Sequence, residues 1–178
     1  MVPEAPLRST EYGLVPDGDG WFVLNAHEVR WFEDELGGYC GFEGKPRFPQ
    51  LGINLNLLSP GRPMAMYHRE NEQEDFLVLA GECVLVIEGE ERHLRAWDFV
   101  HCPAGTDHVI VGAGERPCLV LAVGSRSGGK GLVYPVSEAA QRYGAGVERE
   151  TSDQAEAYAR FSKPRETNCR EGWLPELY

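Results

Sequence analysis

Two short stretches decide the fold of this protein: residues 61–74, GRPMAMYHRENEQE, and residues 98–108, DFVHCPAGTDH. Each sets imidazole or carboxylate side chains beside a turn, at the end of an apolar run. His68 and Glu70 are two residues apart on a predicted strand, so their side chains leave from the same face. Glu74 begins the next strand, and it lies within reach of both because neighbouring strands are about 4.8 Å apart.

The second stretch supplies another imidazole. A turn at Pro103-Ala-Gly105 precedes His108, which begins a further strand. Together the two stretches predict four metal ligands at one point inside a β-barrel: His68, Glu70, Glu74 and His108. Two imidazoles with one or two carboxylates suit a divalent transition metal, and zinc, iron and manganese all remain open.

The strand pattern extends beyond these stretches. Short apolar runs fill residues 51–124 and are separated by turn residues, which is typical of an antiparallel sandwich or a closed barrel. We predict a single domain with an N-terminal arm and edge strands in residues 1–50, a barrel core in 51–124, and a helical tail in 125–178. The tail is expected to pack on the same domain.

Local patterns predict elements outside the barrel core. Short strands are expected at residues 21–24 and 28–32, and helices near residues 137–143 and 152–161. Thr151 and Gln154 would form a capping box for the second helix.

The composition excludes several classes of partner. The 178 residues include 17 basic and 28 acidic side chains, a net charge of −11, so we expect no nucleic-acid partner. The same charge disfavours an anionic membrane surface, and no apolar run approaches the roughly 18 residues of a membrane span. Five scattered cysteines and the lack of a signal-peptide pattern favour a cytoplasmic protein.

The first stretch resembles the first motif of the cupin family. That motif has Gly, five residues, His-x-His, three or four residues, Glu, six residues and Gly. Here Gly61 is followed by six residues, His68-x-Glu70, three residues, Glu74, six residues and Gly81. The chain therefore departs from the motif by one extra residue after Gly61 and by Glu70 at the usual place of the second His.

The second stretch resembles the second cupin motif, which has Gly, five residues, Pro-x-Gly, two residues, His, three residues and Asn. Pro103, Gly105 and His108 keep their places, whereas Trp97 and Gly112 replace the first Gly and the final Asn. The resemblance implies an all-β cupin double-stranded β-helix, or jelly-roll barrel, with a short C-terminal helical extension. It also implies a homodimer, because cupins commonly pair through their sheets.

The residue at position 70 leaves two chemical alternatives open. If Glu70 is a ligand, the four side chains make a formally neutral site around a divalent ion, which is then a weaker Lewis acid. If it is not, His68, Glu74 and His108 form the triad used by non-haem iron oxygenases, and Glu70 is a candidate general base. His101 is a second candidate catalytic residue, provided that its side chain points into the barrel and not to solvent.

These residues predict a metal-dependent enzyme acting on a small polar metabolite inside the barrel. The resemblance implies an isomerase of sugars or keto acids, or a dioxygenase, and the sequence does not choose between them. One alternative is a non-catalytic barrel that binds or senses a small molecule, and another is a purely structural barrel.

Overall fold

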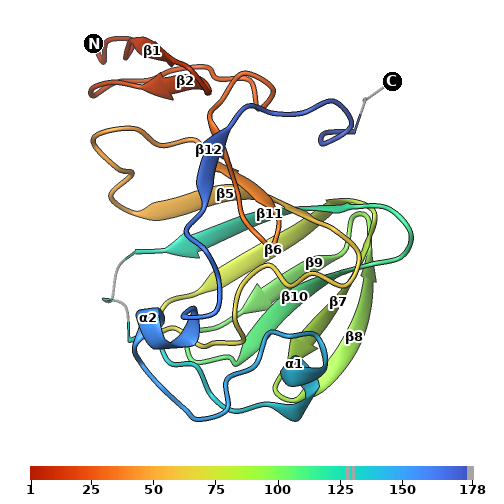
Figure 1. Ribbon diagram of the computed structural model, residues 1–178. Helices are drawn as coiled ribbons and strands as arrows, with labels where there is room; N and C mark the ends of the chain where they lie inside the picture. The colour runs from red at the N-terminus through yellow and green to blue at the C-terminus, as the bar shows by residue number, and fades with distance from the viewer. Residues whose placement is uncertain (127–128, 130, 176–178) are drawn as a thin grey trace.

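The computed structural model of the chain describes residues 1–126, 129 and 131–175 (Figure 1). Antiparallel strands dominate these residues, and the prediction of an all-β fold is confirmed. The elements in chain order are β1 (Leu7–Thr10), β2 (Gly13–Pro16), β3 (Trp31–Glu33), β4 (Gly38–Gly41), β5 (Leu51–Leu58), β6 (Glu74–Ala80), β7 (Glu82–Ile87), β8 (Glu90–Arg95), β9 (Phe99–Cys102), β10 (His108–Ala113), β11 (Cys118–Ser125), α1 (Glu138–Arg142), α2 (Gln154–Ala157) and β12 (Arg165–Thr167). Neither helix in these residues has the length and apolar character needed to cross a membrane.

Two sheets form the barrel. One has the strand order β12-β3-β4-β5-β11-β6-β9, and the other has the order β10-β7-β8. Strand β11 returns to lie between β5 and β6 and pairs antiparallel with both. This insertion of a late strand between two earlier ones is typical of a jelly roll rather than of a simple meander.

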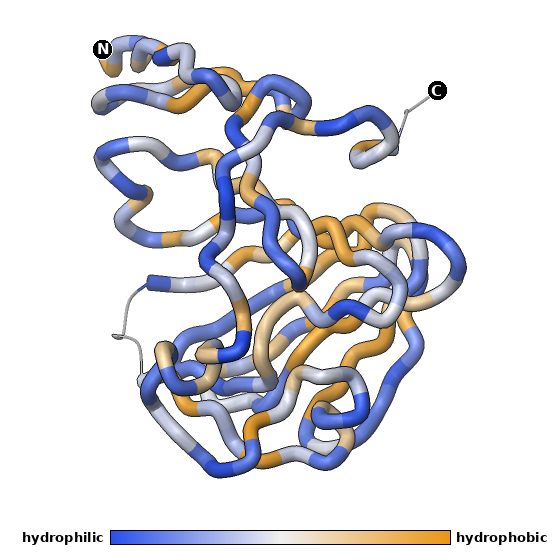
Figure 2. Tube along the Cα trace, in the orientation of Figure 1, coloured by the Kyte–Doolittle hydropathy of each residue, from blue (hydrophilic) through white to orange (hydrophobic). Residues whose placement is uncertain are grey.

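Strand β7 shows how alternation builds the core. Cys83 and Leu85 point into the barrel interior, where they join the main apolar cluster. Val84 and Val86 point the other way and pack with Ala140 of α1 in a second cluster. The strand is thus buried on both faces, which explains its nearly continuous apolar sequence. Figure 2 shows the apolar residues gathered along the barrel strands.

The N-terminal region differs from the sequence-based expectation. A strand was expected at residues 21–24, but the structure has the hairpin β1-β2 before this point and begins β3 at Trp31. The hairpin turn is closed by the Thr10 hydroxyl, which donates to the Gly13 carbonyl at 2.7 Å. Such a bond between a side chain and a nearby backbone group leaves little trace in hydrophobic periodicity.

The two helices lie within the predicted segments but are shorter than expected. The predicted capping box is wrong, because Asp153 caps α2 and its side chain accepts a hydrogen bond from the Ala155 amide. The Thr151 hydroxyl instead donates to the Glu156 carboxylate at 2.7 Å. The predicted cap at Thr151 and the observed cap at Asp153 would each satisfy free backbone amides at the start of α2. They place the start of the helix two residues apart.

The C-terminal tail packs against the N-terminal strands. Strand β12 pairs with β3, and the ring of Trp173 lies 5.1 Å from that of Trp31, measured between centroids. Trp31 is fully buried by this packing. Strand β12 of the tail therefore forms one edge of the larger sheet beside β3, while the division into three parts stays a prediction.

The two departures at the ends of the second motif have opposite structural consequences. Trp97 adopts φ +77°, a conformation that glycine accepts freely and tryptophan does not, and 72% of its surface is exposed. At Gly112 the added Cβ of any other residue would lie 2.4 Å from the Ser59 carbonyl oxygen. Glycine is therefore dispensable at the first position and required by the close backbone approach at the second.

Candidate metal centre

The two predicted stretches meet through their backbones. The His68 amide donates to the His108 carbonyl at 3.1 Å, and the His108 amide donates to the His68 carbonyl at 2.9 Å. The turn between β9 and β10 adds a third bond, from the Gly105 amide to the Glu70 carbonyl at 2.7 Å. This pairing sets the two imidazoles side by side, with 5.0 Å between their ring centroids.

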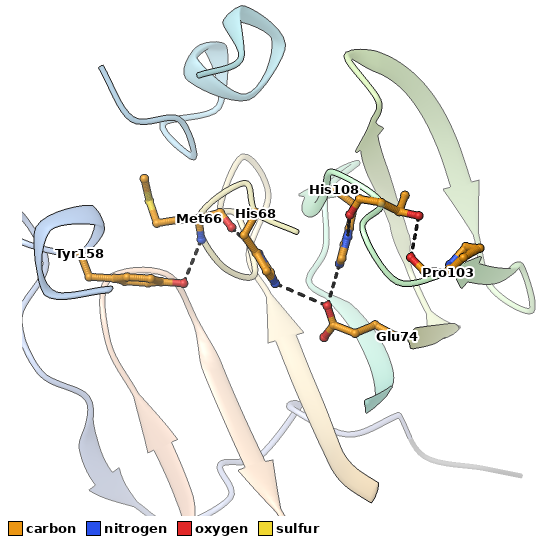
Figure 3. A network of polar contacts seen from close by, with 7 residues as sticks. Met66, His68, Glu74, Pro103, His108 and Tyr158 are labelled. Carbon is orange, nitrogen blue, oxygen red and sulfur yellow. Dashed lines mark hydrogen bonds and ion pairs between the residues drawn. The ribbon is translucent and has the colours of Figure 1, made fainter. Parts of the chain in front are cut away.

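Glu74 completes the group from the larger sheet. It is the first residue of β6, and its side chain points the same way as those of Phe76 and Val78, which lie in the barrel core. Its Oε2 atom lies 3.2 Å from Nε2 of His108 and 3.5 Å from Nε2 of His68 (Figure 3). One donor atom from each of the three residues lies within 4.8 Å of the others.

Two of these atoms lack a hydrogen-bond partner. Glu74 Oε2 and His108 Nε2 are buried, and their mutual contact is close but lacks hydrogen-bond alignment. Proteins rarely leave buried polar atoms unsatisfied, and a bound ion is one ordinary reason for an exception. The donor set of two imidazoles and a carboxylate therefore fits a divalent transition metal on this geometry as well as on residue type.

Backbone carbonyls fix which nitrogen of each imidazole faces the centre. Nδ1 of His68 lies 2.7 Å from the Met66 carbonyl oxygen, and Nδ1 of His108 lies 3.0 Å from that of Thr106. A carbonyl oxygen can only accept a hydrogen bond, so each Nδ1 carries the proton when the imidazole is neutral. The lone pair is then on Nε2, which is the arrangement of histidine ligands in metal proteins.

A residue from the tail holds this arrangement in place. The Met66 amide donates to the hydroxyl oxygen of Tyr158 at 3.0 Å, so the peptide units around Met66 bond to both Tyr158 and His68 (Figure 3). Burial raises the pKa of Tyr158, so its hydroxyl stays protonated at neutral pH. Sequence analysis missed Tyr158, because nothing near it in the sequence links it to a segment 92 residues earlier.

The electrostatics of the group favour charged side chains. Burial alone would raise the pKa of Glu74, but the neighbouring His108 and His68 outweigh burial and lower that pKa to about 2. Burial alone would lower the pKa of His68, yet the Glu74 carboxylate raises it above its ordinary value. Because the contacts lack hydrogen-bond alignment, we attribute both shifts mainly to charge proximity. The group therefore holds a carboxylate across a wide pH range.

Glu70 lies beside the group without joining it. It lines the same cavity as His68 and Glu74, but none of its oxygens belongs to the set of converging donor atoms in the described residues. Its backbone carbonyl is engaged by the Gly105 amide. Whether Glu70 binds a metal or acts as a base stays a prediction.

The structure does not bring His101 to the group. Strand β9 pairs with β6 so that His101 lies opposite Asp75, while the next residue lies opposite Glu74. Successive side chains alternate between faces, so His101 points away from the side that holds Glu74. Its side chain is 51% exposed, and its Nδ1 lies 2.6 Å from the Asp75 carboxylate. A role for His101 in catalysis finds no support in this position.

Two of the three converging residues, His68 and Glu74, line a cavity of about 220 Å³. Asn54 and Asn56 of β5 contribute its polar wall, and Phe76 and Tyr134 contribute aromatic rings. Sequence analysis did not single out the two asparagines. Their alternation with leucines in the run INLNLL was the available signal, because it places two amides on one face of a barrel strand.

Comparison with known proteins identifies the central part of the chain. The family model for the cupin domain matches residues 55–124. The polyketide cyclase RemF from Streptomyces resistomycificus shares 16% identity and a TM-score of 0.56, over 72% of this chain and 99% of that one. A predicted oxalate decarboxylase from Thermotoga maritima shares 21% identity and a TM-score of 0.54, over 60% and 100%. At these identities the likeness concerns the fold alone.

Further similarities are weaker in structure. A sugar phosphate isomerase of the cupin superfamily from Silicibacter pomeroyi shares 27% identity over 57% of this chain and 62% of that one, with a TM-score of 0.47 that is too low to support an inference. The chain spans 54% and 62% of the lengths of the first two structures that it matches. No curated protein matches the chain.

Proposed function

Because residues 55–124 form a cupin domain, we propose that this protein is a metal-dependent enzyme acting on a small polar metabolite within its barrel. The proposed metal is a divalent transition ion held by His68, Glu74 and His108. One observation carries the proposal: Glu74 Oε2 and His108 Nε2 are buried beside His68 without hydrogen-bond partners.

The surroundings of the group suit catalysis on an oxygen-bearing substrate. A divalent ion there would polarise a substrate oxygen and stabilise an enolate or oxyanion. Three protein ligands leave coordination positions open for substrate or water. Phe76 and Tyr134 give the cavity an aromatic wall, and Asn54 and Asn56 offer amide groups that would orient substrate oxygens. A substrate bound to the ion through an oxygen atom would suit either isomerisation or oxygenation. The identity of the metal would distinguish between the two reactions.

Glu70 has one of two roles in this proposal. As a fourth ligand it would neutralise the charge of a divalent ion, and as a base it would accept a proton from substrate. Glu70→Gln separates them, because it removes the charge while keeping the size of the side chain. A ligand role predicts weaker metal binding in this variant, whereas a base role predicts unchanged metal binding and lost turnover.

Two parts of the proposal rest on sequence alone. We propose a homodimer that pairs through its sheets, from the family resemblance, and a cytoplasmic location, from the scattered cysteines and the lack of a signal-peptide pattern. Sedimentation equilibrium of the purified protein tests the first, because a monomer at micromolar concentration would contradict it. Fractionation of the source cells tests the second.

Elemental analysis of the purified, untagged protein tests the metal centre. We expect about one metal per chain in the wild type and its loss in His68→Ala and His108→Ala. His93→Ala is the matched control, because His93 is exposed on β8 and lies outside the group. A wild-type protein that stays metal-free after incubation with zinc, iron or manganese would refute the proposal. A ligand that then raised the melting temperature and emerged unchanged would favour a binding module.

A further inference from the structure

A second and larger cavity adjoins the one at the metal centre. It has a volume of about 790 Å³, against about 220 Å³ for the cavity that His68 and Glu74 line, which we call the metal-centre cavity. Its walls come from residues 34–39, from β5 and from residues 154–164 of the tail. Ligand sites usually measure about 300–1,000 Å³. The larger cavity is therefore of the size that accommodates a whole substituent of a substrate.

This cavity, which we call the apolar chamber, has a predominantly hydrophobic wall. Its main apolar lining residues are Leu36, Tyr39, Leu58, Met64, Tyr158 and Phe161. Two of its polar residues are already engaged within the protein. The Asp34 carboxylate accepts hydrogen bonds from the Leu36 and Gly37 amides, and the Ser162 hydroxyl donates to Glu35 at 2.7 Å.

The apolar chamber and the metal-centre cavity share part of their walls. Asn56, Met64, Gln154 and Tyr158 line both. A third cavity borders the metal centre and is charged, since its wall includes Glu70, Arg126 and Glu74, the last of which also belongs to the metal centre. The metal-centre cavity thus has an apolar neighbour and a charged neighbour.

We propose that the substrate is amphipathic, with an oxygen-bearing head at the metal centre and an aryl or branched alkyl group in the apolar chamber. The inference rests on the metal centre of the proposed function, because the head requires a metal, and it replaces the small polar metabolite by an amphipathic one. A substrate consisting only of a small polar head would leave the apolar walls in contact with water, whereas an apolar group covers them. Burial of a phenyl-sized group strengthens binding by about tenfold or more.

Two hydroxamates test this inference on the zinc-loaded protein. Acetohydroxamate and benzohydroxamate have the same chelating head and differ in the phenyl ring. Isothermal titration calorimetry should give benzohydroxamate an affinity at least about tenfold higher, after correction for the affinities of the two compounds for free zinc. The probes need not be substrates, since only the contribution of the ring is measured.

Variants that fill the chamber locate the effect. Ala155→Trp and Ala159→Trp each place an indole at its exposed rim, and both should reduce the advantage of benzohydroxamate to less than about threefold. Ser152→Trp is the matched control, because Ser152 is an exposed residue of the same segment that does not line the chamber. It should retain the full advantage.

The outcomes separate this inference from the proposed function. Equal affinities for the two hydroxamates in the wild type would overturn the inference and leave the metal centre intact. A phenyl advantage that persists in both filled variants would also overturn it, because the ring would then bind elsewhere. A protein that binds none of zinc, iron and manganese would overturn the proposed function and the inference together.

Discussion

Replacement of Tyr158 by phenylalanine tests whether the tail controls the metal centre. Tyr158→Phe keeps the ring that packs 5.9 Å from the ring of Tyr134 and removes only the hydroxyl that accepts from the Met66 amide. Met66 is 1% exposed, so water does not replace the lost partner. An unsatisfied buried amide costs about 1–3 kcal/mol of unfolding free energy.

The same change should weaken metal binding. The Met66 carbonyl accepts from Nδ1 of His68, and loss of the partner on the Met66 amide frees this segment to move. Outer partners of metal ligands affect affinity by about 10–100-fold. Tyr158 acts through Met66 and not on His68 itself, so we expect the lower end, about tenfold. Competition with a zinc-binding dye measures the affinity, and urea unfolding with chelator measures the stability.

Tyr143→Phe provides the control for this experiment. It also removes one tyrosine hydroxyl, but that hydroxyl donates to the Glu91 carboxylate, which does not line the metal-centre cavity. This variant should leave zinc affinity unchanged. If Tyr158→Phe bound zinc as tightly as the wild type while losing stability, the coupling between the tail and His68 would be refuted.

Two further predictions follow from backbone strain and from charge. Trp97→Gly should raise the unfolding free energy by about 1 kcal/mol, because it relieves the backbone strain of φ +77° at a residue whose side chain is exposed. Equilibrium urea unfolding measures this change. A loss of stability would contradict the strain argument. In the metal-free protein, His68 should stabilise the fold below its ordinary pKa of 6.5, and this contribution should vanish as the pH rises through its raised pKa. Glu74 should stabilise it above its ordinary pKa of 4.5, with loss as the pH falls towards 2. Zinc affinity should instead increase with pH, because the metal requires neutral imidazole; melting curves of the wild type and His68→Gln, with and without zinc, test all three trends.

The sequence allowed prediction of those features that depend on short-range pattern. The alternation of apolar residues and the spacing of turns indicated the barrel. The alternation of side chains along strands, together with the motif spacing, indicated that His68, Glu74 and His108 lie close together. The same alternation did not decide whether the His101 side chain points into the barrel. That direction depends on the register of β9 against β6, which is fixed by tertiary pairing and not by the sequence of β9.

Features set by long-range contacts were not predictable in this way. The apolar chamber needs residues 34–39 and 154–164 to meet over β5, and no periodicity within either segment indicates that meeting. The size of the substrate site therefore depends on segments outside the motifs. The two motifs supply the candidate metal ligands, and the flanking segments shape the cavity in which a substrate would bind.

The donor atoms of the candidate centre come from both sheets of the barrel. His108 begins β10 of the smaller sheet, Glu74 begins β6 of the larger one, and His68 is joined by backbone bonds to His108. An ion bound to all three would cross-link the sheets at one end, in addition to any chemistry it performed. Separation of the sheets there would require its release, so saturation at 100 times the dissociation constant would oppose opening by about 2.7 kcal/mol. The concentration of free metal would then contribute to the stability of the folded protein.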